Sequence, residues 1–126
     1  MDYKEVLLEM LMEKVNGAKP ATLESPSLAN EFVGKICMVR AESAGVFYGT
    51  VVKKQGSEII IEGARRVWYW EGAASLSQLA TVGTSKPDNC KFPCAVSQVY
   101  LDKVCEIIPM TPSAVASLDA VAVWKK

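Results

Sequence analysis

The sequence predicts an α+β domain in which a small, bent antiparallel sheet carries helices at its ends and edges. Several short apolar runs follow one another closely between residues 34 and 110, with turn residues between them. Apolar residues at helical spacing precede this region, and a helix-start signal follows it. With 126 residues, half of them hydrophobic, the chain has the size and composition of one folded domain with a sizeable core.

A first helix is predicted over residues 3–16. Asp2 and Glu5 have the spacing of a capping box, and the apolar residues that recur at helical spacing are Leu7, Leu8, Leu11 and Val15. Because apolar side chains occupy a wide arc of this helix, we expect it to be covered on more than one side, either by the domain's own sheet or with the help of a partner subunit. Residues 18–30 contain two prolines and predict a surface connection.

The sheet is predicted to begin as an antiparallel meander of four strands. The three Ile residues at 59–61 indicate a strand that is buried on both faces, and Gly63-Ala64 is expected to end it. The predicted strands cover residues 35–41, 46–53, 58–62 and 65–70, with turns at 42–45 and 54–57.

A short central helix is predicted over residues 73–80, with Gly83 as its stop signal. Two further strands are expected over residues 94–100 and 103–108. Thr111 followed by Pro112 predicts the start of a C-terminal helix over about 112–120. The tail, residues 121–124, is apolar enough to dock onto the domain.

Charge and composition favour binding over catalysis. The 14 basic and 14 acidic residues cancel, which argues against a polymeric nucleic acid as partner. The chain has no histidine, so it lacks the commonest general base and the commonest metal ligand. We therefore expect no enzyme activity and no cofactor.

The N-terminus and the cysteines predict a cytoplasmic protein. The first residues resemble neither a signal peptide nor a membrane span, so the four cysteines are expected to be reduced. Cys90 and Cys94 form a close pair, but without histidine their spacing is a weak zinc signal, and no metal is expected. Cys37 and Cys105 lie in apolar runs and are expected to be buried.

The densest cluster of functional side chains is the run Arg65-Arg66-Val67-Trp68-Tyr69-Trp70. Strand alternation places Arg66, Trp68 and Trp70 on one face and Arg65, Val67 and Tyr69 on the other. A guanidinium suits a phosphate and an indole ring suits a nucleobase, so either face combines groups that recognise a nucleotide. The alternative is that the Trp rings fill the core while the arginines reach solvent.

Further candidates surround this run. The small residues from Gly72 to Ser77 open the predicted central helix, where free amides would attract an anion and Ser75 and Ser77 would add hydroxyl donors, unless this is an ordinary capped helix. Arg40 ends a strand beside the turn at 43–45 and either faces the same pocket or is simply solvated. The loop between Pro87 and Pro93 offers Asn89, Lys91 and Phe92 to a ligand, although Phe92 could instead anchor the core.

Residues 64–80, together with 43–47 before them and 90–94 after them, resemble the first-described Thoeris anti-defence family of phage and prophage proteins. The resemblance extends from about Gly34 to Pro109. It implies a protein that binds the signalling nucleotide glycocyclic ADP-ribose and sequesters it without cleaving it. It also implies homo-oligomers with pockets between subunits, and a second ligand class, cyclic oligonucleotides, for some members.

Ligand chemistry then selects the residues expected to bind the nucleotide. They are Phe47, Arg40, Arg65, Arg66, Trp68, Trp70, Ser75, Ser77, Asn89, Lys91 and Phe92. Two other functions stay open at this point, a hydrolase of a similar nucleotide and a non-catalytic structural or interaction module of a phage particle.

Overall fold

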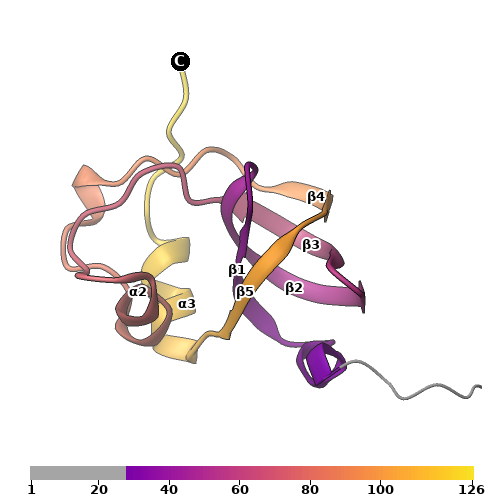
Figure 1. Ribbon diagram of the computed structural model, residues 1–126. Helices are drawn as coiled ribbons and strands as arrows, with labels where there is room; N and C mark the ends of the chain where they lie inside the picture. Colours follow the sequence, from indigo (N-terminus) through magenta and orange to yellow (C-terminus); the bar gives the residue numbers. More distant parts are fainter. Residues whose placement is uncertain (1–27) are drawn as a thin grey trace, which may run out of the picture.

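A five-stranded antiparallel sheet with two α-helices against it forms the centre of the computed structural model, which describes residues 28–126 (Figure 1). This confirms the predicted α+β class. The predicted helix over residues 3–16 lies outside the described residues, as does the predicted connection up to residue 27. The last residues of that connection lie in a short 3-10 helix, η1 (Leu28–Phe32).

The strand order in the sheet is β4-β3-β2-β1-β5. The first three strands form the predicted meander, and β5 returns to pair with β1. The strands are β1 (Ile36–Ala41), β2 (Gly45–Gln55), β3 (Glu58–Arg66), β4 (Val96–Leu101) and β5 (Val104–Pro109).

The third strand differs from the prediction, because Gly63 does not end it. Gly63 adopts a φ of +58°, a conformation open to glycine, and the ladder continues beyond it after a bulge. Gly49 lies opposite this bulge, and a Cβ atom there would lie 2.5 Å from Cγ2 of Ile61. The strand therefore continues to Arg66, and the predicted separate strand over residues 65–70 is wrong. Within residues 67–70, only Tyr69 forms an isolated bridge, with Lys91.

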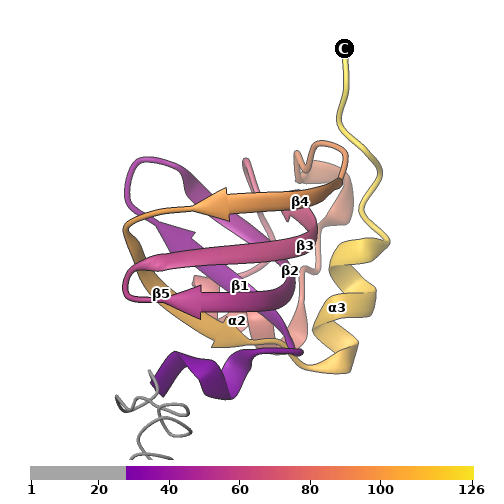
Figure 2. The same cartoon turned by 90° about the vertical axis from the view of Figure 1, so that its right-hand side faces the viewer.

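The sheet folds over on itself, so that β1 and β5 cross behind β2, β3 and β4 (Figure 2). Backbone hydrogen bonds fasten the overlap, including Val104 N–H to the Ser57 carbonyl and Glu42 N–H to the Lys103 carbonyl, both 3.0 Å. Ile59 and Ile61 point into the enclosed core, whereas Ile60 on the other face is half-buried. The buried residues of this first core cluster are Cys37, Val39, Ala41, Phe47, Val51, Ile59, Ile61, Ala64 and Leu101.

Helices α2 (Leu76–Val82) and α3 (Pro112–Asp119) cover the opposite face of the sheet (Figure 1). The start of α3 agrees with the prediction, since Thr111 caps it and Pro112 is its first residue. Helix α2 begins three residues later than predicted, because Ser75 has an extended backbone and caps it. A second core cluster lies under both helices, and its buried residues are Met38, Tyr48, Val67, Leu79, Ala80, Cys90, Phe92, Leu118 and Val121.

The C-terminal tail docks as predicted. Val121 is buried, Val123 forms a parallel bridge with Phe92, and Trp124 N–H donates to the Phe92 carbonyl at 2.9 Å. The tail thus runs from α3 to the loop that precedes β4. The 3-10 turn η2 (Pro87–Asn89) lies earlier in the chain, before Phe92. In residues 28–126, no helix is long and apolar enough to cross a membrane.

All four cysteines are free thiols. Cys37 is buried as predicted, and burial raises its pKa to about 11, partly offset by the charge of Lys35. Cys105 is exposed, so the prediction that it is buried is wrong, because its side chain lies on the outer face of β5. Cys90 is buried and Cys94 is exposed, which places the two members of the close pair in different environments.

Candidate functional site

One pocket collects Arg66, Trp68 and Trp70 against the turn between β1 and β2. It has a volume of about 280 Å³, and the turn with the first two residues of β2 contributes residues 43–46 to its lining. Alternation along the chain brings these side chains together, since Arg66 and Trp68 are exposed while Arg65 and Val67 point inward. Arg66, Trp68 and Trp70, which the sequence groups on one face, all line the pocket, but Val67 from the opposite group lines it too and Tyr69 is exposed.

The guanidinium of Arg66 is held at the edge of this pocket by two contacts. Its carbon atom lies 4.3 Å from the centroid of the Phe47 ring, a cation–π contact. Nη1 donates to the Ala44 carbonyl at 2.6 Å, and the group makes no other hydrogen bond within residues 28–126. Its remaining N–H groups have no hydrogen-bond partner in this part of the chain. Phe47 itself is buried and supports the guanidinium from below.

Trp68 and Trp70 differ in burial. Trp68 has 61% of its surface exposed, whereas Trp70 is partly buried against the second core cluster. The pocket therefore has one fixed aromatic wall and one that extends into solvent. A planar ring that stacked on either indole would exchange water for aromatic surface, which is the interaction that nucleobases make with indole rings.

Arg65 is not available to a ligand, although the sequence placed it in the site. Its side chain is buried and donates to four backbone carbonyls, those of Phe92 and Pro93 in the loop and those of Leu118 and Val121 at the end of α3. The distances are 2.8–3.2 Å. Arg65 therefore ties three segments of the chain together, and the prediction that it binds ligand is wrong.

Phe92 is also removed from the site. It is fully buried, its ring meets Tyr48 edge-on at 6.5 Å, and the Arg65 guanidinium lies 5.4 Å from its centroid. Its alternative role as a core anchor is the one that the structure supports. Tyr48 in the same cluster donates to Asp119 at 2.8 Å, and burial, with a smaller contribution from that hydrogen bond, raises its pKa to about 12.

The start of α2 is capped by side chains. Ser75 accepts a hydrogen bond from Gln78 N–H at 3.1 Å, and the Gln78 side chain accepts one from Ala74 N–H at 2.9 Å. Ser77 is exposed on the helix, and neither serine lines the pocket. The alternative of an ordinary capped helix therefore describes this segment, and its two serines do not contribute to the pocket.

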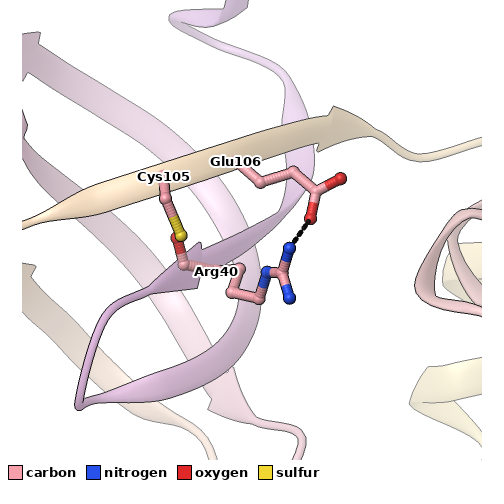
Figure 3. Close-up of polar contacts among 3 residues, drawn as sticks. All are labelled: Arg40, Cys105 and Glu106. Carbon is pink, nitrogen blue, oxygen red and sulfur yellow. Dashed lines mark hydrogen bonds and ion pairs between the residues drawn. The ribbon is translucent and has the colours of Figure 1, made fainter.

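Arg40 is paired with an acid on the neighbouring strand. Its Nη2 lies 3.0 Å from Oε1 of Glu106 on β5, the residue directly opposite in the register (Figure 3). Cys105 also contacts Arg40, since its Sγ lies 3.4 Å from the Arg40 carbonyl oxygen. Arg40 does not contribute to the lining of the pocket.

Asn89 and Lys91 belong to a polar cluster beside the pocket. The Asn89 amide donates to Oε1 of Glu71 at 3.0 Å, and the Tyr69 hydroxyl donates to Oε2 at 2.6 Å. These two hydrogen bonds hold the pKa of the Glu71 carboxyl below its usual value, and the bond from Tyr69 has the larger effect. Lys91 lies 5.8 Å from the Tyr69 ring and 5.6 Å from the Trp124 ring.

A larger groove lies elsewhere, between the start of β1, the end of β5 and α3. It has a volume of about 610 Å³, and its lining is mainly aliphatic, with Lys35 and Asp119 as the charged members. It contains no aromatic ring and none of the predicted ligand residues, so its chemistry suits a nucleotide less well. Among the described residues, no group of three His, Cys, Asp or Glu side chains could hold a metal ion.

Sequence reasoning missed two contributors. Residues 43–46, which span the β1–β2 turn and the start of β2, line the pocket, and their proximity to Arg66 follows from the β2–β3 register, which the bulge at Gly63 sets. Trp124 stacks on Trp68 with ring centroids 6.3 Å apart and planes inclined by 8°. An apolar tail that ends in Trp was the available signal for this contact, but the sequence did not indicate where the tail docks.

Comparison with known proteins identifies a domain family. Residues 34–118 match the family model described as Domain of unknown function (DUF6948). The matched region contains all five strands, α2 and all but the last residue of α3. No curated protein sequence matches the chain.

Proposed function

Because the chain belongs to the DUF6948 family, a domain of unknown function, we propose its function from the pocket itself: it binds a small anionic nucleotide of the cyclic ADP-ribose type and sequesters it without cleavage. The observation that carries this proposal is the convergence of Arg66, Trp68 and Trp70 on one pocket. Such a nucleotide combines phosphates with adenine and ribose, and the pocket offers a guanidinium beside two indole rings.

The pocket lining favours binding over hydrolysis. Of the described residues that line it, Arg66 is the only charged one, and none is a carboxylate, a thiol or an imidazole. General acid–base catalysis needs a group of that kind within hydrogen-bond reach of the reacting atoms. The Ser43 hydroxyl is the one nucleophilic group in the lining, and a serine without an adjacent base is a weak nucleophile.

Sequestration requires a higher affinity than one such open pocket provides. A protein that competes with a receptor at limited excess needs a dissociation constant of about 1 nM, or about −12 kcal/mol. A volume of about 280 Å³ lies at the lower end of the range for small-molecule sites, and Trp68 leaves it open on one side. In this proposal a second copy of the chain covers the ligand, so the acting species is a homo-oligomer.

The biological setting of the proposal comes from the resemblance to the Thoeris anti-defence family. The protein would act in the cytoplasm of an infected bacterium, where it would bind glycocyclic ADP-ribose before the effector of Thoeris immunity is activated. Cyclic oligonucleotides, with the same combination of phosphate and base, form a second ligand class for the same pocket. Binding of either ligand class requires no cofactor.

Retention and release of the nucleotide test the proposal. Purified protein is incubated with glycocyclic ADP-ribose, filtered, heat-denatured and analysed for released nucleotide. We expect intact nucleotide in stoichiometric amount from the wild type and from Arg40→Ala, and a marked loss from Arg66→Ala. Degraded nucleotide in place of retained nucleotide would show a hydrolase, and nucleotide that passes through unbound would leave a structural or interaction module as the better account.

A further inference from the structure

The aromatic wall formed by Trp68 is supported from outside the pocket. Trp68 is 61% exposed, so its own surroundings leave most of the ring in solvent. Its one aromatic neighbour among the described residues is Trp124, at 6.3 Å between centroids and 8° between planes. This is the offset parallel arrangement that aromatic pairs favour. Trp124 does not itself line the pocket.

Trp124 is fixed in turn by the backbone. Its N–H donates to the Phe92 carbonyl at 2.9 Å, next to the parallel bridge between Val123 and Phe92. Phe92 is fully buried, so the tail is attached to a rigid part of the core. Lys91 adds a cation 5.6 Å from the Trp124 ring. The tail beyond α3 therefore has a defined course where it passes the loops (Figures 1 and 2).

We propose that Trp124 is a positioning residue for the pocket: by stacking on Trp68, the C-terminal tail holds that ring in the orientation in which it receives the planar part of a ligand. This inference rests on the proposed function. It predicts that loss of the Trp124 ring weakens nucleotide binding although the ring touches no ligand, because Trp68 then samples orientations in which it does not form the wall.

Three variants test this role. Trp124→Ala removes the stack, Trp124→Phe keeps a smaller ring there, and Val123→Ala changes a neighbouring side chain that is half exposed. Affinity for glycocyclic ADP-ribose is measured by calorimetry. Stacked indoles also give an exciton couplet in the circular dichroism spectrum, which is recorded without ligand in a Trp70→Phe background so that only the pair contributes.

We expect Trp124→Ala to weaken binding about 3- to 10-fold and to abolish the couplet. Trp124→Phe should restore most of the affinity without the couplet, and Val123→Ala should match the wild type in both. If Trp124 only stabilised the fold, Trp124→Ala would lower the melting temperature. Trp124→Phe would then not be expected to keep most of the affinity while losing the couplet.

Two results would overturn the inference. One is wild-type affinity in Trp124→Ala, and the other is a couplet that survives that substitution. If the wild type itself binds no glycocyclic ADP-ribose, the proposed function fails. The support of Trp68 by Trp124 is then decided by the couplet alone, which needs no ligand.

Discussion

The guanidinium carbon of Arg66 lies 4.3 Å from the centroid of the Phe47 ring, on the strand next to its own. Arg65, its neighbour in the sequence, lies on the other face of the same strand and is buried. Two adjacent arginines thus have opposite roles. One is partly free and faces a pocket, whereas the other has its donors occupied by backbone carbonyls. Substitution of Arg66 should therefore affect mainly binding, and substitution of Arg65 should affect mainly stability.

Arg65→Ala is expected to destabilise the protein by about 3 kcal/mol or more, because it removes four hydrogen bonds and leaves the Pro93 and Val121 carbonyls without a donor among the described residues. Urea denaturation followed by circular dichroism measures the change in the free energy of unfolding. The matched control is Arg40→Ala, which removes a half-exposed ion pair and should cost less than about 1 kcal/mol. Similar losses for the two variants would contradict the structural role of Arg65.

Trp68→Ala is expected to weaken nucleotide binding by about 5- to 100-fold, the range for loss of one base–aromatic stack. Because Trp68 is largely exposed, the melting temperature should change little. Fluorescence titration and thermal denaturation of the same samples give both values. Unchanged affinity, with a probe that the wild type binds, would exclude Trp68 as a wall of the site.

Alkaline pH is expected to destabilise the protein through Tyr48. Burial raises its folded-state pKa from 10.0 to about 12, so its contribution to stability is full below pH 10 and is lost as the pH rises toward 12. The loss amounts to about 2–3 kcal/mol. Denaturation curves between pH 9 and pH 12 should show a shallower decline for Tyr48→Phe than for the wild type. Parallel declines would contradict this assignment.

The four thiols should divide into two classes of reactivity. Cys94 and Cys105 are exposed, whereas Cys37 and Cys90 are buried. The raised pKa of Cys37 lowers its thiolate fraction further. We expect mass spectrometry to find two labelled cysteines after brief maleimide treatment of the native protein and four after treatment in urea. Rapid labelling of Cys37 in the native protein would contradict the described core.

Local sequence signals predicted the strands and the last helix well. Thr111-Pro112 predicted the start of α3, and alternation along the chain predicted opposite directions for Arg65 and Arg66. The end of β3 was wrong, because a glycine that allows a bulge has the same local signature as one that ends a strand. The difference depends on Gly49 in the neighbouring strand, which sequence spacing does not reveal.

The candidate site was predicted only in part, since its membership depends on contacts between distant segments. The sequence does not distinguish the buried Arg65, which has four carbonyl acceptors, from the exposed Arg66. Likewise, the stack between Trp68 and Trp124 joins residues 56 positions apart (124 − 68) and follows from where the tail docks. The types of residue in the pocket were therefore predictable, but the acceptors and neighbours that decide their roles were not.

Calorimetric titration of glycocyclic ADP-ribose into the wild type and Arg66→Ala tests the central claim most directly. The account predicts saturable, tight binding by the wild type and about 10- to 100-fold weaker binding by Arg66→Ala, the range for one lost charge-assisted hydrogen bond to phosphate. The unfolding free energy of the variant should stay close to that of the wild type, since Arg66 is exposed. No binding by the wild type, or equal affinity in both proteins, would contradict it.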